Sequence, residues 1–179
     1  MLIIQAPDHV LSAIAKPVGK VDDEIKNLIE EMKLTLASQK DPEGVGLAAP
    51  QVGHSLQLFI IKPTKTGPFS VFMNVSVKVL ETEKQRKNKK GNAKLEGCLS
   101  IKDVWGTVKR SQKIEATYMD EAGVTLTKTF SSWPATIIQH EYDHLQGILF
   151  PRRVLEQKGK LYKTHKDENG EDVFDRVDI

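Results

Sequence analysis

Apolar residues recur at helical spacing in one segment near the N-terminus. They fall three or four positions apart, on one face of a helix: Ile25, Leu28, Ile29, Met32 and Leu36. Asp22 precedes this stripe, and its carboxylate can accept a hydrogen bond from an amide of the first turn. The pattern predicts a core-facing helix that begins after Asp22 and ends near Ala37.

Short apolar or alternating runs predict strands in the middle of the chain. Residues 56–61 are a short, mostly apolar run, and residues 69–80 alternate and are rich in β-branched side chains. Residues 113–119 and 124–130 flank the turn-like segment 120–123, which ends in glycine, and they predict a hairpin.

A second helix is predicted between Ser131 and Gly147. Ser131 and Ser132 are candidate caps, and Pro134 suits a first turn because it has no amide hydrogen to leave unpaired. Gly147 is placed to end the helix. The element order predicts an α+β fold in which antiparallel strands pack around this central helix.

Length and composition favour a single domain over residues 1–179. The net charge of +2 is too near neutral to indicate specific DNA binding, and no apolar segment approaches membrane-spanning length. The start lacks the basic-then-apolar plan of a signal peptide, so we expect a cytoplasmic protein without membrane association. The domain includes a lysine-rich loop at about 82–95 and a tail at about 151–179. In the tail, apolar and polar residues alternate in two runs, 161–165 and 173–177, which predict a hairpin or a late strand.

The predicted second helix carries Gln139-His140-Glu141-Tyr142-Asp143-His144. Residues four apart project from nearly the same helix face, so His140 and His144 can bind one metal ion. Glu141 would lie beside the metal and could take a proton from a bound water, which points to hydrolysis. The alternative is a buried amphipathic helix whose histidines only hydrogen-bond.

A third ligand is needed, because a catalytic metal usually has three protein ligands and one open position. The single cysteine, Cys98, follows Gly97 in Glu96-Gly97-Cys98-Leu99-Ser100 and cannot form an internal disulfide. It is a candidate ligand, with an inert core cysteine as the alternative. A Cys-His-His set suits zinc, ferrous iron or nickel, and ligand type does not choose among them.

A third block runs from Gly44 to Gln51 and is small, apolar and spaced by glycines. Its backbone could approach and pair with an extended peptide, and the amide of Gln51 can donate a hydrogen bond to an oxyanion. A buried turn that packs on the core is the alternative reading of this block taken alone.

Taken in order, the three blocks resemble the bacterial peptide deformylases. That family carries Gly-hydrophobic-Gly-hydrophobic-Ala-Ala-Pro-Gln, then Glu-Gly-Cys-Leu-Ser, then Gln-His-Glu-x-Asp-His, and all three occur here without an altered core position. The resemblance runs from the N-terminus to about Phe150. It implies an enzyme that removes the formyl group from the N-terminal methionine of nascent chains.

The resemblance also implies roles for the matching residues. Cys98, His140 and His144 would hold one divalent metal, ferrous iron in the cell, with zinc or nickel as alternatives after purification. Glu141 would be the general base and then the general acid. The resemblance gives the oxyanion and formyl contacts to Gln51, to the amide of Leu99 and to the backbone of Gly46. The methionine pocket would be bordered by Val45, Glu96, Gly97 and Ile137.

Other charged residues around these motifs are candidates for supporting roles. Metal-bound imidazoles usually donate their second N–H to an acceptor, so Glu96 and Asp143 are candidates to orient ligands, with Arg110 as an anchor for one of them. The alternatives are a solvated or capping carboxylate at Asp143 and an ordinary surface arginine at Arg110. The lysine-rich run from Lys84 to Lys90 is a solvated loop or a contact with an anionic partner such as the ribosome surface.

Trp105 stands where many family members have an arginine that contacts the substrate backbone. It could instead offer an apolar wall to a peptide side chain, or pack as an ordinary core residue. Two rival functions therefore remain open: a zinc peptidase, which the histidine motif alone favours, and a non-catalytic binding protein related to these enzymes.

Overall fold

The computed structural model describes residues 1–40, 43–80 and 94–177. In this part of the chain three α-helices, α1 (Asp23–Ser38), α3 (Ser132–Leu145) and α4 (Phe150–Glu156), accompany nine strands and two short 3₁₀ helices, η1 (His9–Leu11) and η2 (Ala49–Val52). The predicted lysine-rich segment from Lys84 to Lys90 lies outside the described residues.

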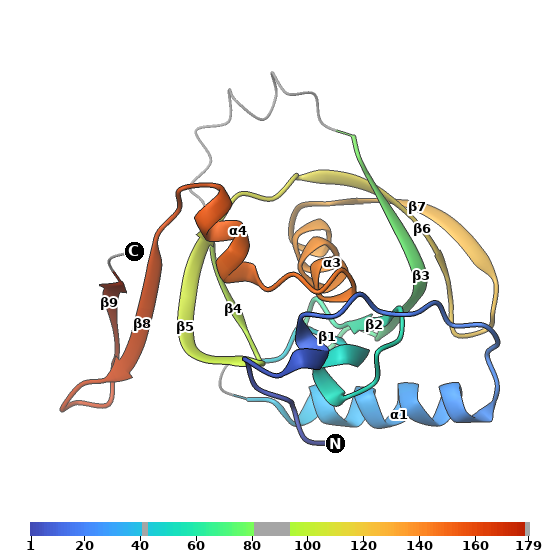
Figure 1. The fold of residues 1–179 in the computed structure, drawn as a ribbon, viewed down its shortest axis with the longest axis horizontal. Helices are drawn as coiled ribbons and strands as arrows, with labels where there is room; N and C mark the ends of the chain where they lie inside the picture. The colour runs from blue at the N-terminus through green and yellow to red at the C-terminus, as the bar shows by residue number, and fades with distance from the viewer. Residues whose placement is uncertain (41–42, 81–93, 178–179) are drawn as a thin grey trace.

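The strands form two sheets in which all pairings are antiparallel. The five-stranded sheet has the order β1-β2-β3-β6-β7. Its strands are β1 (Gly46–Ala48), β2 (Leu58–Ile61), β3 (Ser70–Val79), β6 (Lys113–Met119) and β7 (Thr125–Ser131). The four-stranded sheet has the order β4-β5-β8-β9. Its strands are β4 (Lys94–Cys98), β5 (Ile101–Val108), β8 (Leu161–Lys166) and β9 (Asp172–Val177). The predicted α+β class is confirmed, with α3 near the centre of the molecule (Figure 1).

Strand β2 is buried on both faces, which explains why its sequence is a continuous apolar run. Phe59 and Ile61 belong to the core cluster that includes α3 residues, whereas Leu58 and Ile60 belong to the cluster that includes α1 residues. The five-stranded sheet therefore lies between α1 and α3.

The local signals of α1 and of the β6–β7 hairpin gave correct predictions. Asp22 is the N-cap of α1, and its carboxylate accepts a hydrogen bond from the Ile25 amide at 3.1 Å. Asp120 accepts hydrogen bonds from the amides of Ala122 and Val124 in the hairpin turn.

Helix α3 begins and ends close to the predicted residues. Ser131 is its N-cap, although its hydroxyl makes no capping hydrogen bond, and Pro134 lies in the first turn. Gly147 has φ +67°, and the amides of Gly147 and Ile148 close the helix on the carbonyls of His144 and Asp143.

The C-terminal segment adds α4 and a hairpin to the second sheet. Phe150 and Val154 of α4 pack with Val108 and Cys98 in a third, smaller core cluster. The predicted late hairpin is present as β8–β9, and β8 pairs with β5 through Trp105 and Tyr162. In Figure 1 the hairpin lies at the left edge of the molecule. Among the described residues, no helix has both the length and the apolar content to cross a membrane.

Candidate metal centre and adjoining pocket

Cys98, His140 and His144 meet at one point of the interior. Cys98 is the last residue of β4, and the two histidines lie one turn apart on α3. Their ligand atoms all lie within 4.8 Å of one another, and Cys98 Sγ is 3.3 Å from His144 Nε2. One thiolate and two imidazoles at this separation form the donor set of a site for zinc, iron or a similar ion.

The ionisation of these side chains suits a cation. Burial lowers the pKa of His144, which keeps the ring neutral and able to donate a lone pair. Burial also works against protonation of His140, but hydrogen bonds with Cys98 and Glu96 and the charge of Glu141 raise its pKa. The centre therefore attracts positive charge, which a bound divalent metal would supply.

Glu141 is buried beside the ligands without being one of them. The residue is 3% exposed, and Oε2 has no hydrogen-bond partner among the described residues. Burial raises the pKa of its carboxyl to about 7, despite the positive charges of His140 and Arg110. A carboxylate with such a pKa can both take and return a proton near neutral pH.

Gly46 explains how Glu141 fits against β1. A Cβ atom built on Gly46 would collide with the Glu141 carboxylate, so only glycine allows this approach. The glycine at position 46 of the first sequence block thus has a steric reason that the sequence alone did not show.

Gln51 is fixed in η2 by both ends of its amide. Its Oε1 accepts from the Ala48 amide at 2.9 Å, and its Nε2 donates to Ser100 Oγ at 3.1 Å and approaches Cys98 Sγ at 3.4 Å. The donating end of Gln51 therefore faces the metal ligands. Leu99 lies in the turn between β4 and β5, and its carbonyl accepts from Gln5 at 2.9 Å.

A cavity of about 280 Å³ opens beside this centre. Its polar end contains Gln51, Cys98, His140 and Glu141, whereas His144 lies deeper and is 1% exposed. Backbone and apolar surface line the rest, from residues that the sequence blocks indicated: Val45, Gly46, Gly97, Leu99 and Ile137. Leu95, Trp105, Trp133 and Thr136 complete much of the wall.

The family model for polypeptide deformylase matches residues 1–160 of this chain. The chain belongs to the peptide deformylase family. A peptide deformylase of Borreliella burgdorferi is 36% identical over 171 residues, which cover 95% of this chain and 98% of that protein. One of Pseudothermotoga lettingae is 37% identical over 143 residues, covering 80% and 76%. The crystal structure of peptide deformylase from Thermotoga maritima superposes with a TM-score of 0.72 at 32% identity, covering 85% of this chain and 95% of that one.

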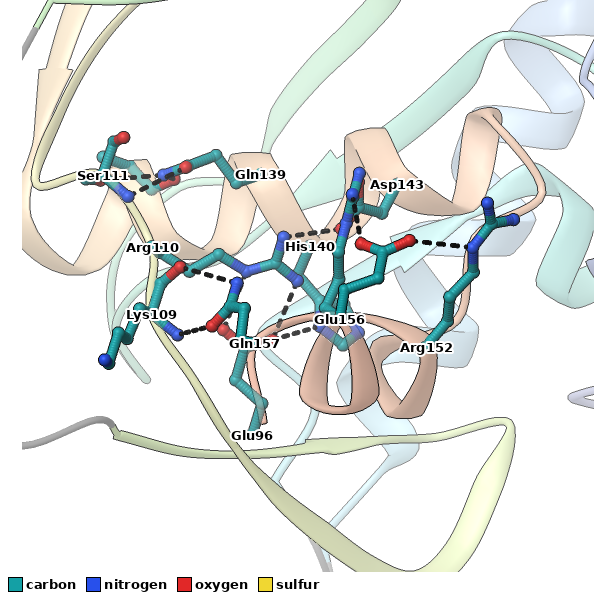
Figure 2. Close-up of polar contacts among 12 residues, drawn as sticks. Glu96, Lys109, Arg110, Ser111, Gln139, His140, Asp143, Arg152, Glu156 and Gln157 are labelled. Carbon is teal, nitrogen blue, oxygen red and sulfur yellow. Dashed lines mark hydrogen bonds and ion pairs between the residues drawn. The ribbon is translucent and has the colours of Figure 1, made fainter. Parts of the chain in front are cut away.

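In this member of the peptide deformylase family, an ion-pair network supports His140. Glu96 Oε2 is 3.0 Å from His140 Nδ1, and Arg110 holds both oxygens of Glu96, at 2.9 and 3.0 Å (Figure 2). Burial would raise the pKa of Glu96, but the bonds with His140 and Arg110 lower it to about 2. Glu96 therefore stays ionised and orients the His140 ring.

Asp143 lies in the same network, and its carboxylate is bonded to two arginines. Its carboxylate accepts from Arg110 at 2.6 Å and from Arg153 at 2.6 and 3.0 Å. The sequence identified Asp143 and Arg110 but gave no sign of Arg153, whose place on α4 is a tertiary effect. Asp143 thus anchors Arg110, and Arg110 anchors Glu96 (Figure 2).

Sequence reasoning missed further contributors to the site. Ser100 bonds to Gln51 and was visible in the Glu-Gly-Cys-Leu-Ser block, where a hydroxyl is a natural partner for an amide. Leu95 and Thr136 line the cavity, and neither belongs to a pattern that would have distinguished it from ordinary strand and helix residues.

Proposed function

We propose that this chain hydrolyses the formyl group from the N-terminal methionine of newly synthesised polypeptides and releases formate. The observation that carries the proposal is the meeting of Cys98, His140 and His144 with a buried, unpartnered carboxylate oxygen of Glu141 at the end of a cavity. Membership of the peptide deformylase family supports the same reaction.

We assign the metal to Cys98, His140 and His144. A bound divalent metal would supply a water acidic enough to act as the nucleophile near neutral pH. Ferrous iron is our proposal for the metal in the cell, with zinc or nickel as alternatives after purification, because a thiolate with two imidazoles accepts all three. A site built on a thiolate would also be sensitive to oxidation at Cys98.

Glu141 is the proposed acid–base residue. Its carboxylate takes a proton from the attacking water and returns it to the amine that leaves. The Gln51 amide and the backbone N–H of Leu99 are assigned to the oxygen that becomes negative during attack, where one such donor typically contributes about 3 kcal/mol.

The substrate would lie between two sheet edges. β1 and β4 are each the first strand of their sheet, and residues of both line the cavity. An extended peptide can pair with such an edge, which would let Gly46 position the formyl group. We assign Val45, Gly97 and Ile137 to the methionine pocket. Glu96 lines the cavity too, but its carboxylate is taken by Arg110 and His140.

We also propose a cytoplasmic location, where ribosomes would supply nascent formylated chains. We also propose that the segment from Lys84 to Lys90 attracts the anionic ribosome surface, an idea that its charge alone supports. Replacing these lysines by serines should weaken co-sedimentation with ribosomes at low salt; unchanged co-sedimentation would remove the idea.

Formate release from a formyl-methionyl tripeptide tests the main proposal. The protein would be purified without oxygen and loaded separately with iron, nickel and zinc, with the acetyl-methionyl peptide as control. Release from the formyl peptide alone is the expected result. Cleavage of internal peptide bonds would favour a zinc peptidase, and no turnover at full metal occupancy would favour a binding protein.

A further inference from the structure

The C-terminal hairpin reaches the cavity through one aromatic contact. The rings of Trp105 on β5 and Phe174 on β9 meet edge to face, with centroids 6.3 Å apart and planes at 62°. Trp105 lines the cavity, whereas Phe174 belongs to a segment beyond the residues 1–160 that the family model matches. The hairpin is therefore joined to the cavity wall.

Strand alternation shows which face of the sheet carries this contact. A Cβ on Gly106, the residue after Trp105, would meet Val154 of α4 and Leu161. Side chains of successive strand residues point to opposite faces, so Trp105 lies on the face away from α4. Tyr162, which pairs with Trp105, lies on that same face, and so does Phe174.

Trp105 is held from two sides. A Cβ on Gly97 would lie 2.9 Å from the indole ring, so the ring rests against the backbone of β4 next to Cys98. On its other side the ring meets Phe174. A side chain fixed in this way presents a defined surface to whatever enters the cavity.

Several apolar side chains close to Trp105 are partly open to solvent. Leu95 is 43% exposed and Trp133 39% exposed at the same cavity, and Phe174 is 43% exposed beside it. Glu43, which also lines the cavity, is paired with Lys65 at 3.4 Å. Exposed apolar surface that continues a binding cavity favours an apolar ligand group.

We propose that Trp105, positioned by Phe174 of the C-terminal hairpin, selects substrates with an apolar side chain in one of the two residues after formylmethionine. This inference rests on the proposed function and adds a preference to it. Trp105 is the specificity-determining residue, because it lines the cavity, and Phe174 is a positioning residue that acts through it.

Three formyl-methionyl tripeptide amides test the preference: Met-Phe-Ser, Met-Ser-Phe and Met-Ser-Ser. We expect the metal-loaded wild-type chain to have a kcat/KM about 10-fold higher for one phenylalanyl peptide than for the seryl peptide, the low end of what apolar pockets discriminate. The difference should lie in KM, because the contact is remote from the reacting atoms.

Variants then separate positioning from general damage. Trp105→Ala should bring the phenylalanyl-to-seryl ratio close to one, and Phe174→Ala should lower it several-fold through KM. Phe174→Tyr keeps an aromatic ring and should keep the ratio. Val177→Ala is the matched control, because Val177 lies on the same strand, is 41% exposed and faces the other side of the sheet; it should keep the ratio too.

The outcomes distinguish this inference from the proposed function. Equal kcat/KM for all three peptides in the wild-type chain, or an unchanged ratio in Trp105→Ala, would overturn the inference and leave deformylation standing. Formate release from none of the peptides would overturn both. The wild-type comparison and Trp105→Ala decide the matter even if Phe174→Ala does not fold.

Discussion

Glu141 is buried beside the side chains of Cys98, His140 and His144, so replacing one atom of its carboxylate should change the chemistry of the site. Replacing it by glutamine keeps its size and removes its basic oxygen. We expect Glu141→Gln to bind metal as the wild-type chain does and to lose about 10²- to 10⁴-fold in kcat, the usual contribution of acid–base catalysis. Metal content and formate release measured on one preparation check this, and near-normal turnover would rule Glu141 out as the base.

Gly46 offers a steric test of the same site. The added methyl of Gly46→Ala would collide with the Glu141 carboxylate, so Glu141 or β1 must shift. Since a misplacement of about 1 Å can cost about 100-fold in rate, we expect a loss of that order in kcat. The matched control is Gly19→Ala, where a Cβ meets nothing within 4 Å. A fully active Gly46→Ala would show that the approach of β1 to Glu141 is not needed.

At the scale of elements, Asp143 joins α3 to α4 and to the Arg110 segment. Its side chain is 6% exposed and accepts a hydrogen bond from Arg110, whose side chain is only 8% exposed. Removing one partner of such a buried pair typically costs about 3–5 kcal/mol, so we expect Asp143→Asn to lower the free energy of unfolding by about 3 kcal/mol. Urea denaturation measures it.

The control for Asp143 comes from the rim of the same network. Glu156 pairs with Arg152 and Arg153 at 3.0 Å, but its side chain is 43% exposed. Exposed pairs add little to stability, so Glu156→Gln should be hard to distinguish from the wild-type chain. An equal loss in both variants would mean that burial does not set the importance of Asp143.

The elements that the sequence predicted well are those with local signals. Helix α1 has its stripe and its Asp22 cap, and the β6–β7 hairpin has a turn closed by Asp120. The second sheet was not predicted, because its pairing joins β5 to β8 across more than fifty residues, and no local pattern records such a partner. The tail hairpin was predicted, but its attachment to Trp105 was not.

For the molecule as a whole, the site was predictable where chemistry demands particular residues at fixed spacing. His140 and His144 share a helix face, so their meeting followed from the motif, whereas Cys98 was a candidate third ligand that the resemblance to the family favoured. The contacts that support the ligands could not be predicted from the motifs, because Arg153 reaches Asp143 only through the packing of α4. The same holds for Phe174, which only the complete fold brings near the cavity.

Metal binding should also stabilise the whole fold, because the ligands come from β4 and α3 and meet only in the folded chain. A ligand at about 1,000 times its Kd adds about 4 kcal/mol, which for this length corresponds to a rise in Tm of roughly 10 °C. We therefore expect chelation to lower Tm by that order in differential scanning calorimetry. Cys98→Ala should abolish most of this metal-dependent difference, whereas His54→Ala, at an exposed histidine outside the ligand group, should preserve it. A metal-dependent shift of the same size in Cys98→Ala would mean that the stabilising ion is bound elsewhere.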